Sequence, residues 1–412
     1  PKFSRVVSRE EIRSNDYNLN IPRYVDSSEA AEHWDVYASM FGGIPTAEID
    51  EMSEFWTAFP ALKKALFTES GIPYVNVSTP DIKSAIKSHP DVVGFENAFN
   101  AAFSTFPAFL KEELIDRMGS IEISKAETVL SADIFERLKE IPLIDKYAAF
   151  QLLDDDWTGI SIDLEMLQTE GFAATKKVDP NLVIKKKDGK DQEVQEGWIG
   201  HIIPFDLVQA TLLSTETDEL HGLESRLAEI PSEYESILDE MTEEDKESCN
   251  DVLTEEGDAF VPKEVSKKIK ELKKDRSPES VALRTLLEKV ESLIKSEKEI
   301  KAEIKAKSAA LQAKTKDTIE SLSDEQALDL LEKKWIAPLI ESIHKLPDTV
   351  IDSLVSKIQA LQNKYATTFF EVEQQISETE ATLSGMIDDL EGNEYDMLGL
   401  KELKKLLGGS AE

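Results

Sequence analysis

Apolar residues recur at heptad spacing over the second half of the chain. A first series runs from 213 to 241, a second from 286 to 311 and a third from 354 to 390. The third consists of Leu354, Ile358, Leu361, Tyr365, Phe369, Val372, Ile376, Leu383 and Leu390. Heptad spacing keeps one face of a helix turned toward a partner helix, so the three series predict an antiparallel intramolecular coiled coil. Pro231 lies in the first series and is expected to kink it or to mark a join.

The first half of the chain has a different pattern. Residues 27–155 contain short helical segments punctuated by proline and glycine, and Phe55, Phe59, Leu62 and Leu66 recur at helical spacing. This predicts a compact helical domain with an aromatic-rich core. From 176 to 203 the pattern becomes extended around Asp188-Gly189, a dipeptide typical of hairpin turns. We therefore expect a small β-hairpin near 182–203.

Together these patterns predict a mainly α protein. Residues 27–204 would form a helical globular domain that contains the β-hairpin, and residues 205–412 a long antiparallel coiled-coil extension. Residues 1–26 are interpreted as the tail of a domain that precedes this sequence.

Composition narrows the class of protein. The 412 residues include one cysteine, Cys249, which excludes an internal disulfide framework and a zinc site built from several thiolates. No apolar run reaches the ~18 residues of a membrane span and no signal peptide is recognisable, so we expect a soluble, cytoplasmic protein. The net charge of -35 disfavours general nucleic-acid binding. Because an acidic stretch at 214–258 precedes a lysine-rich one at 263–307, two neighbouring helices are expected to neutralise each other in part.

The sequence offers no recognisable catalytic site. It contains no Walker loop, G-x-G-x-x-G, nucleophile elbow or HExxH motif. A carboxylate cluster, formed by Asp154, Asp155, Asp156, Asp163 and Glu165, could hold a divalent cation. A solvated helix end is the more frequent role of such a cluster. We therefore predict no catalytic, cofactor-binding or metal-ligating residue.

Two features could contact a partner. A lysine cluster flanks the expected hairpin at Lys176, Lys177, Lys185, Lys186, Lys187 and Lys190. It could bind phosphate, although a lysine-rich hairpin is more often a solvated, protected edge. The heptad seams could recruit a foreign helix, although burial against each other is the simpler outcome. The five tryptophans, Trp34, Trp56, Trp157, Trp198 and Trp335, are expected to pack in the core.

Several segments carry a family resemblance. "SREEIRSNDYNLNIPRYVD" (8–26) resembles the segment that closes the catalytic domain in modification subunits of type I restriction-modification systems, which are adenine-specific DNA methyltransferases. "IPLIDKYAAFQLLDDDW", "SIDLEMLQTEGFAATKKV" and "GWIGHIIPFDLVQATLL" resemble the passage into the family's helical extension, and "LEKKWIAPL" and "NKYATTFFEVEQQI" later parts of it. The sequence has Asp156-Trp157 where the family tends to have Tyr-Trp.

The resemblance implies that this chain is the C-terminal part of the modification subunit. In the family, the catalytic domain binds S-adenosylmethionine through a glycine-containing loop and holds the flipped adenine with an Asn-Pro-Pro-Phe-type motif. Neither element occurs here, so no catalytic or cofactor-binding residue is carried over. The implied partners are the specificity subunit, the restriction subunit and double-stranded DNA.

The implied contacts can be assigned to residues. Docking on the specificity subunit is expected at Leu361, Tyr365, Phe369, Val372 and Ile376, and DNA contact at Lys185, Lys186, Lys187 and Arg23. The competing hypothesis is a free-standing acidic coiled-coil scaffold or adaptor without enzymatic activity. A DNA mimic is disfavoured, because the lysine-rich stretch would mask the acidic helix. A glycine loop and an Asn/Asp-Pro-Pro-Phe/Tyr/Trp motif upstream in the parent reading frame would favour the methyltransferase.

Overall fold

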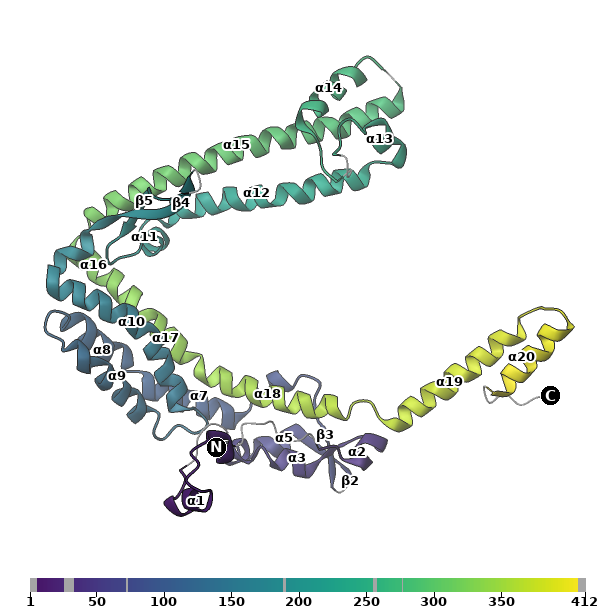
Figure 1. Ribbon diagram of the computed structural model, residues 1–412, viewed down its shortest axis with the longest axis horizontal. Coiled ribbons are helices and arrows are strands. Elements are labelled where there is room, and N and C mark those ends of the chain that lie inside the picture. The colour runs from purple at the N-terminus through teal and green to yellow at the C-terminus, as the bar shows by residue number, and fades with distance from the viewer. Residues whose placement is uncertain are drawn as a thin grey trace. The chain divides into compact units, whose positions relative to one another are not determined.

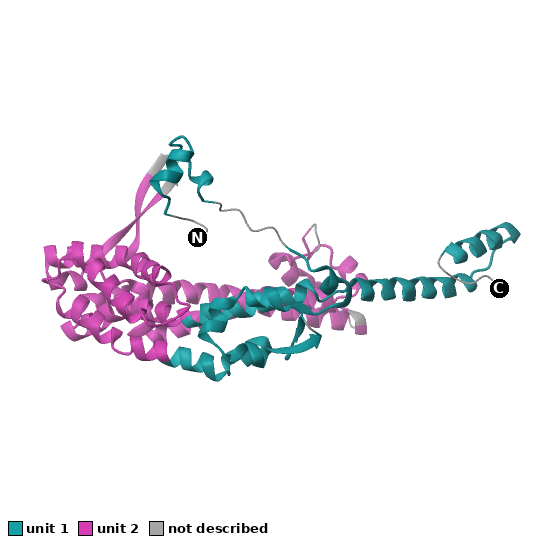
Figure 2. Ribbon diagram, turned by 90° about the horizontal axis from the view of Figure 1, so that it is seen from below, with its two compact units in different colours: residues 1–97, 347–412 teal, residues 98–346 magenta. Residues whose placement is uncertain are grey.

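The computed structural model describes residues 6–25, 33–71, 73–187, 190–254, 258–275 and 277–406 (Figure 1), with backbone alone at 185–187, 190, 191 and 279. The chain divides into two compact units (Figure 2). Unit 1 comprises residues 1–97 and 347–412, and unit 2 comprises residues 98–346. Most described residues are helical, which confirms the prediction of a mainly α protein.

Unit 1 combines short helices with a small sheet. Its elements are α1 (Arg9–Ser14), η1 (Ile21–Arg23), α2 (Val36–Phe41), β1 (Ile44–Pro45), α3 (Thr46–Asp50), α4 (Ser53–Ala58), α5 (Leu62–Leu66), β2 (Phe67–Gly71), β3 (Tyr74–Val77), α6 (Ile82–Lys87), the first part of α7 (Pro90–Phe103), nearly all of α18 (Leu346–Lys364), α19 (Phe369–Asp388) and α20 (Glu394–Leu406). The predicted core residues Phe55, Phe59, Leu62 and Leu66 are all buried.

The sheet of unit 1 was not predicted from the sequence. Its strand order is β1-β3-β2, with both pairs antiparallel and Ile44 opposite Val75. The short helices expected over 27–155 are present, and these strands, which were not predicted, lie among them. Strands of two to five residues are too short to display a clear alternation of apolar and polar positions.

Unit 2 contains the longest helices. Its elements are the remainder of α7, α8 (Phe106–Leu110), the π-helical η2 (Lys111–Asp116), α9 (Ile123–Arg137), α10 (Lys146–Glu170), η3 (Phe172–Lys176), β4 (Val178–Lys187), β5 (Lys190–Gly200), α11 (Phe205–Thr211), α12 (Ser214–Glu240), α13 (Glu243–Ser248), α14 (Pro262–Leu272), α15 (Pro278–Glu320), α16 (Asp324–Leu331), the π-helical η4 (Glu332–Ile336) and α17 (Ala337–His344).

The main core of unit 2 joins α9 and α10 to α16, η4 and α17. Trp335 is 1% exposed and belongs to the same apolar cluster as Leu153, Trp157 and Ile343, which confirms its predicted packing role. The predicted β-hairpin is confirmed as an antiparallel pair that runs from Val178 opposite Gly200 to Lys187 opposite Lys190. The expected turn residues Asp188 and Gly189 lie outside the described residues.

Helices α12 and α15 form a long antiparallel pair (Figure 1). Lys307 pairs with Glu219 at 2.8 Å, and Lys289 pairs with Glu240 at 3.5 Å. Residue numbers therefore rise along α12 where they fall along α15, as in an antiparallel pair. The expected neutralisation between the acidic and lysine-rich segments is therefore found here. Helix α12 continues through Pro231, so the expected join is absent.

A second apolar cluster closes the far end of this pair. It joins Ile237 of α12 and the C-cap Met241 to Leu287 of α15 and to Val265 and Ile269 of α14. The buried Cys249 belongs to the same cluster.

The third heptad series does not form one helix, contrary to the expectation. Helix α18 ends at Lys364 and α19 begins at Phe369, so the series is divided between two helices of unit 1. Thr368 caps α19 through a capping box with Glu371, which explains why the new helix begins there. The pairing of α12 with α15 within unit 2 thus involves only the first two series.

Candidate functional site

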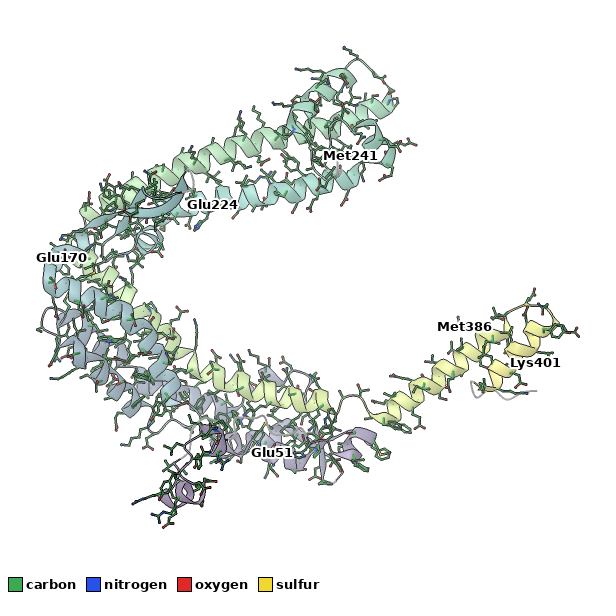
Figure 3. The ribbon with its side chains drawn as sticks, in the orientation of Figure 1. Glu51, Glu170, Glu224, Met241, Met386 and Lys401 are labelled. Carbon is green, nitrogen blue, oxygen red and sulfur yellow. The ribbon has the colours of Figure 1, made fainter. Side chains whose placement is uncertain are left out.

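The candidate site is an apolar seam on α19. Its residues follow the heptad rule and, at 100° per residue, fall on one face of the helix. They are Phe369, Val372, Ile376, Leu383, Met386 and Leu390, the last just beyond the end of α19. All six are exposed, Phe369 by 64%, Ile376 by 52% and Met386 by 63%. The exposed Met386 is labelled on α19 in Figure 3.

A helix of this length gains most of its stability in proteins by burying an apolar face. Within α19, only Ser384 and Ile387 are buried. An exposed apolar face of this kind is typical of a protein-binding surface.

The charged residues of α19 itself have one sign. Residues 369–391 contain seven carboxylates and no lysine or arginine. Glu373 and Glu380 are seven residues apart and flank one side of the seam, in the positions that choose a partner in coiled coils. The surface therefore suits an amphipathic helix with an apolar stripe flanked by lysine or arginine.

The start of α19 is fixed to the body of unit 1 by Tyr365. The ring is buried, its hydroxyl accepts a hydrogen bond from the Asp35 backbone N–H at 3.1 Å, and it donates to the Glu48 carboxylate. Burial raises the pKa of the Tyr365 hydroxyl, and the hydrogen bond to Glu48 raises it further. Lys364 pairs with Glu48 at 2.8 Å. Burial lowers the pKa of Lys364, but its interactions with Glu48 and Tyr365 outweigh burial and hold this pKa above the ordinary value.

Helix α20 extends the exposed apolar surface. Lys404 of α20 pairs with Asp388 at the end of α19, at 2.6 Å. Tyr395, Leu398 and Leu406 of α20 are exposed. The two helices thus present apolar side chains over residues 369–406.

Only part of the predicted docking set lies on one exposed surface. Phe369, Val372 and Ile376 share the exposed face of α19, whereas Tyr365 is buried and Leu361 is half-buried on α18. Leu383, Met386 and Leu390 belong to the surface but were absent from the predicted set. Leu383 and Leu390 already belong to the third heptad series and Met386 follows Leu383 by three residues, so extending the docking set along that series would have found them.

The predicted DNA contacts are placed only in part. Lys185, Lys186 and Lys187 lie on β4, but their side chains are outside the described residues. In the same lysine cluster, Lys177 pairs with Glu170 at 2.6 Å and Lys176 with Asp324 at 2.5 Å, so both are already neutralised. Arg23 is exposed at the end of η1.

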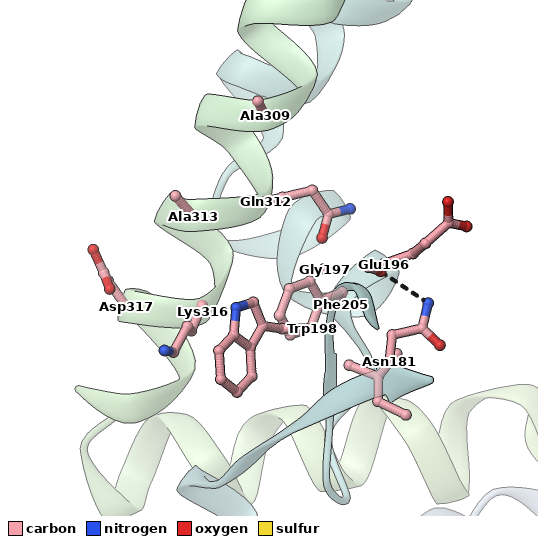
Figure 4. A pocket seen from close by; sticks show the side chains of 11 residues that line it. Asn181, Glu196, Gly197, Trp198, Phe205, Ala309, Gln312, Ala313, Lys316 and Asp317 are labelled. Atoms are coloured by element: carbon pink, nitrogen blue, oxygen red, sulfur yellow. Dashed lines mark hydrogen bonds between the residues drawn. The ribbon is translucent and has the colours of Figure 1, made fainter. Parts of the chain in front are cut away.

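A cavity of about 860 Å³ lies between the hairpin and α15 (Figure 4). Its wall includes Trp198, Phe205 and Gln312. The Lys316 ammonium lies 3.8 Å from the centre of the Trp198 ring, so the chain's own cation covers that aromatic face. Trp198 and Trp34 are exposed by 37% and 55%, which corrects the expectation that all tryptophans are core residues.

One member of the carboxylate cluster, Asp163, has a structural role in the core. Asp163 is buried and accepts hydrogen bonds from Lys334 and, at 2.7 Å, from Trp335 Nε1. Lys334 also donates to the Ile202 carbonyl at 2.6 Å, which ties η4 to α10 and to the end of the hairpin. Asp154 to Asp156 lie within α10 and not at a helix end. Among the described residues, no group of three His, Cys, Asp or Glu is placed to hold a metal ion.

His201 forms a second tie between the hairpin and α10. Its Nδ1 lies 2.6 Å from Asp179 of β4, and its Nε2 lies 3.1 Å from Glu170 at the end of α10. The bond to Asp179 raises the pKa of His201, burial lowers it, and Glu170 adds to the increase.

None of the described helices is long and apolar enough to span a membrane.

Comparison with known proteins finds one family. A model of the N-6 DNA methylase family matches residues 1–33, which relates that segment to DNA methyltransferases. No curated protein and no solved structure matches the chain.

Proposed function

We propose that this chain is the C-terminal part of the modification subunit of a type I restriction-modification system. Its helical extension docks on the specificity subunit through the α19 seam, and the assembly methylates adenine in DNA and also binds the restriction subunit. The observation that carries the proposal is the N-6 DNA methylase match over residues 1–33. The seam supplies the means of assembly.

The local structure of the matched segment supports a missing neighbour. Helix α1 has six residues and neither it nor η1 buries a residue. Val6, Leu19 and Ile21 are exposed nearby. Because a helix this short is marginal in water, the segment fits a role in which a catalytic domain covers these side chains.

This chain does not itself fit S-adenosylmethionine. Its sequence contains neither the glycine loop nor the Asn-Pro-Pro-Phe-type motif that the family uses. The cofactor and the flipped adenine belong to the proposed upstream domain.

The proposed docking requires a partner surface whose chemistry complements that of the α19 seam. An apolar seam flanked by carboxylates selects a helix with apolar positions and basic flanks. Ile376→Asp places a carboxylate at the centre of this contact, and burying it unpaired would weaken docking on the order of 100-fold. Ala381→Asp adds the same charge at an exposed position on the opposite face of α19 and is the matched control.

The test of the function is methyl transfer by the product of the full reading frame. We expect it to methylate adenine in duplex DNA only together with the specificity subunit, and the Ile376→Asp variant to lose most of this activity while Ala381→Asp retains it. A reading frame without the two catalytic motifs, or no methylation with all subunits present, would favour the acidic scaffold instead.

A further inference from the structure

The far end of the α12–α15 pair carries a row of lysines on α14. Lys263, Lys267 and Lys270 are spaced four and three residues apart, which places them on one side of α14, and Lys274 follows the C-cap Lys273 at the same spacing. All four are exposed. The opposite side buries Val265 and Ile269 in the distal apolar cluster. We refer to the four lysines as the α14 lysine row.

The row is distinct from the lysines that hold the fold together. Lys268 pairs with Asp251 at 3.1 Å. Lys289 and Lys307 of α15 form ion pairs with carboxylates of α12. Within the row, Lys267 makes one exposed pair with Glu264 at 3.3 Å. Lys263, Lys270 and Lys274 form no ion pair with the described residues.

The charge of α14 and the residues that follow it is opposite to that of the whole molecule. Residues 262–275 contain six lysines and three carboxylates, whereas the whole chain carries -35. A polyanion approaching this protein is repelled by most of its surface and attracted here. From Lys263 to Lys274 the row extends over roughly 16 Å, a length along which a nucleic-acid backbone presents several phosphates.

We propose that the α14 lysine row binds the phosphate backbone of double-stranded DNA without regard to sequence. The choice of DNA over another polyanion rests on the proposed function. Helix α12 spans about 40 Å from Ser214 to Glu240, so the row contacts DNA at a distance from the main core of unit 2. Lysine contacts to phosphates supply affinity and position, and leave the reading of bases to another surface.

The magnitude follows from counterion release. Four phosphate contacts give a slope of log K against log salt of about -3.6, so a fourfold rise in salt weakens binding on the order of 100-fold. Replacing all four lysines by glutamine should flatten the slope by about three to four and weaken binding at low salt by at least about tenfold.

The test measures fluorescence anisotropy of a labelled random-sequence duplex with the full chain, over about 50 to about 200 mM salt. The first variant carries glutamine at Lys263, Lys267, Lys270 and Lys274. The control carries glutamine at Lys295, Lys298, Lys301 and Lys305, which are exposed on α15 among glutamates. Both variants change the net charge equally, and their circular dichroism melts establish that they fold.

The proposal predicts that only the first variant loses affinity and salt slope. Equal loss in both variants, or no binding by the folded wild type, would overturn it. Tighter binding of poly-glutamate than of duplex DNA at equal charge concentration, lost in the first variant, would also overturn it, in favour of an acidic protein partner. Because the row is far from α19 in sequence and lies in the other unit, the first variant should still co-purify with the specificity subunit. If the wild type itself formed no complex with the specificity subunit, this would instead contradict the proposed function.

Discussion

Replacing Lys334 by methionine should destabilise unit 2, because it leaves the Asp163 carboxylate buried without its cation. Asp163 is 6% exposed and has two donors in the structure, Lys334 Nζ and Trp335 Nε1. Methionine keeps most of the apolar stem of lysine, so the change removes chiefly the ammonium group. It also leaves the Ile202 carbonyl without the Lys334 hydrogen bond.

The expected cost is about 2–4 kcal/mol. Removing one partner of a buried ion pair typically costs about 3–5 kcal/mol. The Lys334 side chain is 27% exposed, so water screens part of the interaction, and Trp335 still donates to the carboxylate. For a domain of this size the melting temperature should fall by roughly 5–15 °C.

Urea denaturation followed by circular dichroism measures the effect. The control is Lys333→Met, the same substitution at the adjacent lysine, whose exposed pair with Asp329 at 2.7 Å is worth less than about 1 kcal/mol. The double variant Asp163→Asn, Lys334→Met should recover part of the loss, because no unpaired charge remains. If Lys334→Met is no less stable than Lys333→Met, the buried pair does not hold η4 against α10.

Three further predictions concern the helices and the hairpin. Gly42 has φ +85° and an added Cβ would lie 3.3 Å from Thr368, so Gly42→Ala should cost unit 1 about 1–2 kcal/mol, whereas Gly94→Ala on α7, with no neighbour within 4 Å, should not destabilise it in thermal melts. Pro231 lies inside α12, so Pro231→Ala should stabilise unit 2 by about 1–3 kcal/mol in urea titrations, and a loss of stability would contradict this. Because the pKa of His201 is raised above 6.5 in the folded state, its stabilisation is complete below 6.5 and is lost as pH rises through the folded pKa. Urea midpoints of wild type should therefore fall over that window relative to His201→Gln, and parallel pH profiles would refute the tie.

Local sequence signals predicted the elements they specify directly. The strands on either side of Asp188-Gly189 pair as expected, and the charges of α12 and α15 meet across the antiparallel pair. The two hairpin strands are consecutive in the chain, whereas α13 and α14 lie between α12 and α15. The buried position of Trp335 was also predicted, because apolar residues recur around it at helical spacing.

Other features depend on information that the heptad pattern does not contain. The third series spans a helix break at 365–368, although Thr368 and Glu371 form a capping-box pair that marks a helix start in the sequence. Tyr365 is buried by contacts with Asp35 and Glu48, more than 300 residues away. Heptad spacing therefore placed Tyr365 and Phe369 on one surface, whereas tertiary contacts separate them.

The exposure of Trp34 and Trp198 has a similar origin. Trp34 packs edge to face on Tyr365 at 6.0 Å, and Trp198 lies under Lys316. An aromatic residue can thus anchor a surface contact while much of its ring stays exposed. The residue type alone does not distinguish this from a core position.

The most direct test of the central claim is co-purification of the chain with the cognate specificity subunit, measured by size-exclusion chromatography with light scattering at moderate salt. Docking through the α19 seam predicts a stable complex with wild type and with Ala381→Asp, and its loss with Ile376→Asp. A complex that forms equally with all three, or none with the folded wild type, would contradict docking through the α19 seam.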